Sequence, residues 1–242
     1  MHNKKMLWRL LFWVGFAILT ILPFWVPEWR LDFHTSNFFY QPSCSPQAWV
    51  LDCHPFYRAL FYSSIPYVSA LILLVGVIVV FWRPQTLAYK RMRLRMAYFV
   101  IVFILGSGLV VNALFKDHWG RPRPVQTQDF GGTATYVPPG KLAINSEGRS
   151  FPSGHSSVGF AFLALWFIWR RECPDWAGWG LGFGLLFGYA IGLARMSVGA
   201  HYLSDVLGSA WMMAGVAWLV YYPLMNMPRR EKALEEVVKK PL

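Results

Sequence analysis

The sequence predicts an all-α protein, a bundle of six helices that span a membrane. Of the 242 residues, 55% are hydrophobic and 18% are aromatic, whereas soluble domains are usually about 45–50% apolar. The apolar residues fall in separate blocks, each about as long as a helix that crosses a bilayer. Basic residues flank these blocks, as in membrane proteins generally, so the net charge of +11 does not indicate a nucleic-acid-binding protein.

The blocks are expected to form a single membrane domain over residues 1–242. The first block has a basic start, like a signal peptide, but its apolar run is longer than the roughly 7–15 residues of a signal-peptide core. No small-x-small cleavage site follows Pro23, so we expect a retained anchor helix. The fifth block is rich in glycine, which permits close packing of helices. The expected spans are 7–26, 64–82, 97–115, 156–169, 177–194 and 204–222.

The distribution of basic residues predicts the orientation of the spans. Six spans place both termini on one side of the membrane, together with a strongly basic loop at 83–95 and the pair Arg170-Arg171. That side holds fifteen of the 23 lysines and arginines. Because Lys and Arg gather in cytoplasmic loops, we expect both termini in the cytoplasm. The segments expected on the outer side are 27–63, 116–155 and 195–203.

The three cysteines indicate at most one disulfide. Cys44 and Cys53 lie nine residues apart in the first outer segment, where a disulfide is permitted, but the spacing leaves open whether they pair. Cys173 is expected on the cytoplasmic side as a free thiol. No Cys/His spacing resembles a zinc site, so we predict no structural metal.

The stretch from Phe151 to Ser157 joins a long polar, glycine-rich segment to the fourth apolar block. Pro152 suits an extended approach or the first turn of a helix, and Ser153 is a typical helix cap. A helix N-terminus there would direct backbone N–H groups at an anion, with His155 beside it as a group that titrates near neutral pH. Alone, the stretch is equally compatible with an ordinary capped helix.

Two further outer segments carry charged residues. Lys116 and Arg121 or Arg123 follow the third block, where they either extend toward lipid headgroups or bind phosphate oxygens. Arg195 lies on the outer side, where basic residues are disfavoured.

His201 and Asp205 are four residues apart, on one face of a helix if the sixth span starts near 201. A carboxylate so placed fixes an imidazole's tautomer and stabilises its charged form. A helix cap beside an interfacial histidine is the alternative.

All three segments lie at the outer ends of spans three to six, so we expect them to converge in one pocket. Two histidines, an aspartate, a lysine, two arginines and a helix N-terminus match the requirements of phosphoryl transfer. The histidine with an aspartate behind it is suited to attack phosphorus, and the other histidine to protonate the leaving oxygen.

The sequence resembles the type 2 phosphatidic acid phosphatases (the PAP2 family), which share a site with vanadium haloperoxidases. Three family motifs occur in order: Lys116-x6-Arg123-Pro124, then Pro152-Ser153-Gly154-His155, then Arg195-x5-His201-x3-Asp205. The third motif usually opens with Ser-Arg. Ala194 precedes the arginine here, which removes a hydroxyl but keeps every charged member.

The resemblance implies a role for each motif residue. His201 is the nucleophile that forms a phosphohistidine, Asp205 orients it, and His155 is first the general acid and then the base that activates water. The residues implied to bind the phosphate are Lys116, Arg123, Ser153, Gly154 through its amide, and Arg195. No metal or other cofactor is implied. His118, Trp119, Arg121 and the turn at 130–132 are not motif positions; they either shape a headgroup pocket or belong to a plain loop.

These expectations define a membrane lipid phosphate phosphatase of the bacterial inner membrane, with its active site facing the periplasm. The Asp-His-Trp-Gly-Arg and Phe-Gly-Gly wording resembles bacterial lipid A phosphatases; undecaprenyl pyrophosphate and phosphatidylglycerophosphate are the other expected substrates. The alternatives are a phosphotransferase that passes the phosphate to a second lipid, a vanadate-dependent peroxidase, and a non-catalytic lipid-binding or transport protein. Intact His155, His201 and Asp205 argue against the last.

Overall fold

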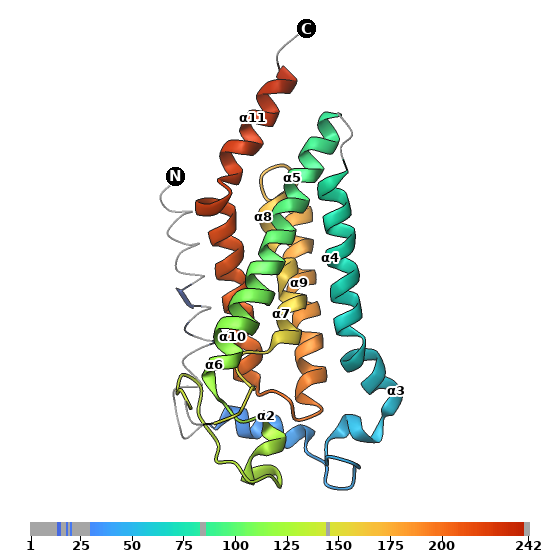
Figure 1. Cartoon of the computed structure of the whole chain (residues 1–242), viewed down its shortest axis with the longest axis vertical. Helices are drawn as coiled ribbons and strands as arrows, with labels where there is room; N and C mark the ends of the chain where they lie inside the picture. Colours follow the sequence, from blue (N-terminus) through green and yellow to red (C-terminus); the bar gives the residue numbers. More distant parts are fainter. Residues whose placement is uncertain are drawn as a thin grey trace.

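The protein is helical throughout the part that the structure describes (Figure 1). The computed structural model describes residues 14, 15, 18, 20, 30–82, 86–143 and 146–239. Within these ranges, isolated β-bridges take the place of named strands. The expected first span, 7–26, lies largely outside the described residues, so the count of six spans stays a prediction.

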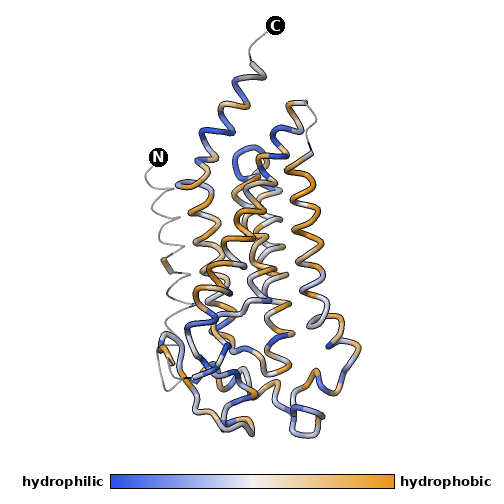
Figure 2. The backbone as a smooth tube through the Cα atoms, in the orientation of Figure 1, coloured by the Kyte–Doolittle hydropathy of each residue, from blue (hydrophilic) through white to orange (hydrophobic). Residues whose placement is uncertain are grey.

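Three helices are long and apolar enough to cross a membrane, and two shorter helices are apolar. The long ones are Leu87–Trp119, Pro174–Met196 and Leu203–Leu224, and the shorter ones are Ile65–Phe81 and Gly154–Trp169. In Figure 2 the apolar colours run along the middle of these helices, and the hydrophilic colours gather toward both ends. This pattern is the one that a bilayer requires of helices that cross it.

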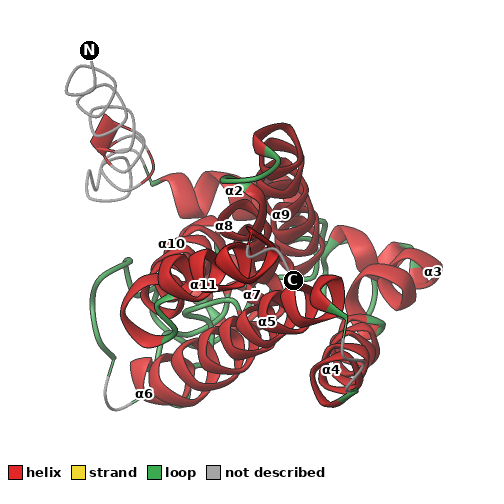
Figure 3. Ribbon diagram, turned by 90° about the horizontal axis from the view of Figure 1, so that it is seen from above, coloured by secondary structure: helices red, strands yellow, loops and turns green. Residues whose placement is uncertain are grey.

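The helices consist of shorter elements in chain order. They are α4 (Ile65–Phe81); α5 (Leu87–Val102), the π-helical η5 (Phe103–Lys116) and α6 (Asp117–Trp119); α7 (Gly154–Phe160), η8 (Ala161–Leu163) and α8 (Ala164–Trp169); α9 (Pro174–Met196); and α10 (Leu203–Leu219), the π-helical η9 (Val220–Leu224) and α11 (Met227–Lys239). Figure 3, seen from above, places α4 at the rim of the bundle next to α5, with α7 near the centre.

The basic segment 83–95 differs from the expected loop, because most of it is helix. α5 begins at Leu87, where the Thr86 hydroxyl oxygen accepts a hydrogen bond from the Tyr89 backbone N–H at 3.4 Å. Lys, Arg, Leu and Met are all good helix formers, so the helix continues through the basic residues into the apolar block. The third helix therefore extends well beyond the expected span 97–115.

The glycine-rich helix α9 packs closely on α7 and η8, as its composition predicts. A Cβ atom on Gly159 would lie 2.5 Å from the Cα of Gly188, and one on Gly184 would lie 2.7 Å from the backbone N of Leu163. Side chains at these positions would force the helices apart. The contact fixes α7, which begins at the Pro-Ser-Gly-His motif, against the helix that ends with Arg195.

One end of the bundle, which we call the loop end, consists of residues 30–63, 116–153 and 197–202. Its first segment is more ordered than the expected interfacial loop: it forms α2 (Leu31–Phe39), η3 (Val50–Cys53), α3 (Pro55–Arg58) and the π-helical η4 (Ala59–Ser63). The disulfide that the sequence left open is present between Cys44 and Cys53. It closes a loop that buries Trp49 completely.

Trp49 connects this first segment to the turn between α9 and α10. Gly199 in that turn has φ +63°, and a Cβ atom there would lie 2.1 Å from Cε2 of the indole. The Leu51 backbone N–H also donates to the Ser197 carbonyl at 3.2 Å. The disulfide-closed loop therefore packs directly on the turn that leads to His201.

Candidate active site

His201 lies in the turn between α9 and α10, with no exposed surface. Its Nδ1 is 2.6 Å from the carbonyl oxygen of Ser150. Because a carbonyl oxygen can only accept a hydrogen bond, Nδ1 carries the ring proton and Nε2 keeps its lone pair. Among the described residues Nε2 has no hydrogen-bond partner. The ring therefore presents a buried, unprotonated nitrogen, which is the form that attacks an electrophile.

Asp205, in the first turn of α10, lies behind His201. The closer carboxylate oxygen is 3.7 Å from Nδ1 of His201, and it accepts hydrogen bonds from Ser150 Oγ at 2.5 Å and from the Tyr202 backbone N–H at 2.8 Å. Ser150 thus binds the carboxylate through its hydroxyl and the imidazole through its carbonyl. Sequence reasoning missed this residue, which directly precedes the Phe151–Ser157 stretch but belongs to no motif.

The environment of His201 keeps the ring neutral. Burial lowers the pKa of His201 from 6.5 to about 4; the Asp205 carboxylate acts against this shift, and the charges of Arg195 and Lys116 add to it. A histidine with such a pKa has an available lone pair at any pH near neutrality.

The second motif forms the expected capped helix start. α7 begins at Gly154, and the Ser153 hydroxyl oxygen accepts from the Ser156 backbone N–H at 3.4 Å. A Cβ atom on Gly154 would lie 2.3 Å from Oδ1 of Asn112, so only glycine fits there. The Ser153 backbone N–H donates to the Asp205 carbonyl at 3.2 Å, which joins the second and third motifs.

His155, the next residue of α7, is partly buried and lies close to the nucleophile candidate. The ring of His201 and the charges of three basic side chains, Arg195, Lys116 and Arg123, all act on His155. Two imidazoles and three cations therefore share one region, as a site for an anion with a proton donor requires.

The three cations come from different elements. Lys116 ends η5 and lines a cavity of about 420 Å³ together with Gly154 and His155. Arg195, in the last turn of α9, is 2% exposed, and its Nε and Nη1 atoms have no hydrogen-bond partner among the described residues. Buried guanidinium N–H groups without a partner are costly. A phosphate that accepts from them would remove that cost.

The motifs and their geometry agree with the comparison to known proteins. Residues 97–228 match the PAP2 superfamily. The chain belongs to the PAP2 superfamily. The match includes all eight motif residues assigned from the sequence, and it leaves the first outer segment, 27–63, outside.

Several curated proteins are similar to this PAP2 chain. A lipid A 4'-phosphatase of Francisella tularensis subsp. novicida is 36% identical over 54% of this chain and 60% of its own length. A lipid A 4'-phosphatase of Rhizobium leguminosarum is 30% identical over 74% of this chain and 75% of its own. The undecaprenyl-diphosphatase BcrC of Bacillus subtilis is 29% identical over 56% and 66%. No solved structure gives a significant match.

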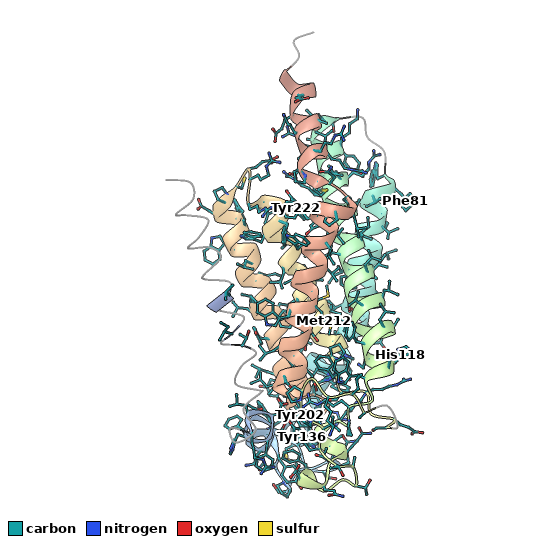
Figure 4. The ribbon with its side chains drawn as sticks, turned by 90° about the vertical axis from the view of Figure 1, so that its left-hand side faces the viewer. Phe81, His118, Tyr136, Tyr202, Met212 and Tyr222 are labelled. Atoms are coloured by element: carbon teal, nitrogen blue, oxygen red, sulfur yellow. A yellow bond between two sulfur atoms is a disulfide. The ribbon has the colours of Figure 1, made fainter. Side chains whose placement is uncertain are left out.

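Two residues outside the PAP2 motifs support the site, and sequence reasoning assigned neither a role there. Arg121 has no exposed surface; its Nη1 lies 2.5 Å from Asp205, and its Nη2 lies 2.7 Å from Asp32 of α2. The rings of Tyr202 and Tyr136 flank the guanidinium at 4.3 and 5.6 Å, and Figure 4 labels both rings at the loop end. Arg121 is two residues from motif residue Arg123, which is the one signal that marks it.

The remaining candidates of the PAP2 loop segment lie in structural positions. His118 is exposed, and its Nδ1 lies 3.0 Å from the Leu114 carbonyl. The Trp119 ring packs on Phe151, with 4.6 Å between the ring centroids. Phe130, in the turn at 130–132, is buried against Trp49. The turn and Trp119 thus pack against the segments that carry the motifs.

Proposed function

We propose that this PAP2 protein is a membrane lipid phosphate phosphatase that works through a phosphohistidine on His201. The observation that carries the proposal is the buried, unpartnered Nε2 of His201 in a region shared with His155 and three basic side chains. A nucleophile, a proton donor and positive charge for the phosphoryl oxygens are the parts that phosphoryl transfer needs.

In the first step, Lys116, Arg123, Arg195 and the backbone N–H groups at the start of α7 hold the phosphate. The Nε2 lone pair of His201 attacks phosphorus in line with the bond to the leaving oxygen. The N–P bond forms as the P–O bond breaks, and His155 gives its proton to the lipid oxygen. Asp205 and the Ser150 carbonyl stabilise the Nδ1–H of the charged ring.

In the second step, neutral His155 takes a proton from a water molecule, which attacks phosphorus from the side that the lipid has left. The N–P bond breaks, inorganic phosphate forms, and His201 regains its lone pair. His155 is again protonated, so the cycle closes without a net change in the protein.

A lipid is the substrate class that the cavity favours. Its wall joins Lys116 and His155 to apolar residues of α4, η5 and α7, among them Leu73, Phe103, Ile104 and Val158. A hydrocarbon chain can lie along this wall while its phosphate reaches the cations. Because two of the similar proteins are named lipid A 4'-phosphatases, lipid A is the first substrate to test. Undecaprenyl pyrophosphate follows because of the third, and phosphatidylglycerophosphate remains a further candidate.

The proposed setting is the bacterial inner membrane, with six spans, both termini in the cytoplasm and the loop end in the periplasm. The excess of basic residues at the opposite end supports this orientation. A disulfide in the first segment of the loop end is consistent with an oxidising compartment.

A phosphotransferase is the second candidate function, since the same phosphohistidine could pass its phosphoryl group to a lipid acceptor in place of water. The open cavity beside His155 favours keeping this candidate. The products separate the two functions: a hydrolase releases free phosphate, and a phosphotransferase yields a new phosphorylated lipid.

The decisive experiment measures phosphate release by the purified protein in detergent. The panel contains lipid A, undecaprenyl pyrophosphate, phosphatidylglycerophosphate and phosphatidic acid, with folded His201→Ala as the blank. We expect release from one lipid class and a loss of about 10³-fold or more in the variant. Activity of His201→Ala near that of the wild type would eliminate the phosphohistidine mechanism. Transfer to a supplied lipid acceptor without free phosphate would establish the phosphotransferase instead.

A further inference from the structure

Tyr62 lies outside the matched PAP2 region, yet its ring contacts two members of the candidate site. The tyrosine belongs to η4, the π-helical turn that precedes α4 and packs against α9. The guanidinium carbon of Arg195 lies 4.1 Å from the centre of the ring. The imidazole of His155 stacks on the ring, with 6.0 Å between centroids and 24° between planes. One side chain therefore touches both the phosphate-binding arginine and the proton donor.

Arg195 needs an external support that does not occupy its N–H groups. Its Nε and Nη1 atoms have no hydrogen-bond partner among the described residues, although the side chain is 2% exposed. An aromatic face attracts a guanidinium without accepting from its edge. Contact with Tyr62 therefore fixes the arginine and leaves these N–H groups for phosphate oxygens.

His155 also benefits from a flat neighbour. A general acid must keep its ring plane so that its N–H points at the leaving oxygen. The nearly parallel ring of Tyr62 restricts rotation of the imidazole about its χ2 bond. The same contact excludes water from that face of the imidazole.

The position of Tyr62 is set by the first outer segment and not by the helices that bear the motifs. Arg58 pairs with Asp52 and lies 5.7 Å from the centre of the Tyr62 ring. Asp52 is adjacent to Cys53 of the disulfide. The disulfide-closed loop therefore anchors the turn that places the ring.

We propose that Tyr62 is a positioning residue of the phosphate site: its ring holds the Arg195 guanidinium and the His155 imidazole in the planes that phosphate binding and proton transfer require. This role rests on the proposed function for its kinetic consequences, but the effect on anion binding does not depend on the identity of the lipid. The ring, and not the hydroxyl, carries the role.

The test compares Tyr62→Phe, which keeps the ring, with Tyr62→Leu and Tyr62→Met, which remove it. Tyr57→Leu is the matched control, because Tyr57 belongs to the same segment and is 51% exposed. For each folded variant, orthovanadate affinity is measured by titration, together with kcat, KM and the pH profile of lipid phosphate hydrolysis. Met keeps a flexible apolar side chain at the site if Leu impairs folding.

We expect Tyr62→Leu and Tyr62→Met to weaken orthovanadate binding about tenfold and to lower kcat/KM at least as much. Tyr62→Phe and Tyr57→Leu should stay within about threefold of the wild type. Unchanged vanadate affinity in the ring-less variants would overturn the proposal, and so would a Tyr62→Phe defect as large as theirs. If the wild type hydrolyses none of the lipids while vanadate binding still depends on the ring, the proposed function fails and the role of Tyr62 stands.

Discussion

Nη1 of Arg121 and Oδ1 of Asp205 lie 2.5 Å apart in the protein interior, where neither side chain has exposed surface. The same guanidinium reaches Asp32 at 2.7 Å. Asp32 in turn accepts from the Ser204 backbone N–H at 2.9 Å. Segments far apart in the sequence thus meet in one buried charge network directly behind the nucleophile candidate.

Replacement of Arg121 by glutamine should destabilise the protein and reduce activity together. It would leave Asp32 and Asp205 buried without their countercharge, which typically costs on the order of 3–5 kcal/mol. Thermal unfolding in detergent and phosphate release measure the two effects. Arg149→Gln is the control, because Arg149 and Asp117 form an exposed pair at 3.5 Å whose loss should cost about 0–1 kcal/mol. Equal effects of the two changes would show that the buried network is unimportant.

His201 should make stability depend on pH in the acid range. Its pKa falls from 6.5 to about 4 through burial, so the unfolded chain binds the proton first as the pH decreases. The stabilisation is fully present above pH 6.5 and is lost as the pH falls toward 4. At pH 5 the loss relative to pH 8 should be on the order of 2 kcal/mol.

The measurement for His201 compares unfolding at pH 8 and pH 5 for the wild type and for His201→Gln. The variant lacks the titrating ring, so its stability should change less across this interval. An identical pH dependence in both proteins would mean that His201 does not titrate in the way its burial indicates.

Removal of metal ions should leave hydrolysis within about twofold of the untreated rate. Lys116, Arg123 and Arg195 already supply the positive charge that metal ions supply in many phosphoryl-transfer sites. Activity before and after EDTA treatment tests this, with re-addition of Mg²⁺ and Zn²⁺. Orthovanadate, which mimics the five-coordinate transition state, should inhibit the same preparation. A strict requirement for an added cation would contradict the motif-based mechanism.

Gly199→Ala should disturb the turn that leads to His201. The residue has φ +63°, and its new Cβ atom would meet the Trp49 indole at 2.1 Å, for a combined cost of roughly 2–5 kcal/mol. Gly215→Ala is the control, because a Cβ there has open space among the described residues and alanine favours helix. Loss of thermal stability and of phosphate release is expected for the first variant alone.

The parts of the structure that sequence could predict depend on local information. The apolar block expected at 64–82 is α4 at Ile65–Phe81, and α7 begins directly after the expected cap, Ser153. Hydropathy and capping are properties of a few neighbouring residues, so they can be recognised without the fold. The same reasoning placed the basic residues of 83–95 in a loop, because charge was weighed above helix propensity.

The missing parts of the site depend on contacts between distant segments. Asp32 and Arg121 are 89 residues apart, and the Ser150 carbonyl reaches His201 from 51 residues away. A buried carboxylate in an aromatic-rich segment carries no local pattern that separates it from an interfacial one. A backbone carbonyl has no side-chain signature at all. Tyr62 likewise becomes significant only when η4 packs on α9.

The cavity beside Lys116 and His155 also has a pharmacological consequence. Its polar end lies at the basic cluster, whereas the rest of its wall is mostly apolar and belongs to α4, η5 and α7. A selective inhibitor should therefore combine an uncleavable phosphate mimic, such as a phosphonate, with a hydrophobic tail that follows this wall. A water-soluble phosphate analogue alone would engage the charges that PAP2 proteins share, and the tail would provide discrimination among them.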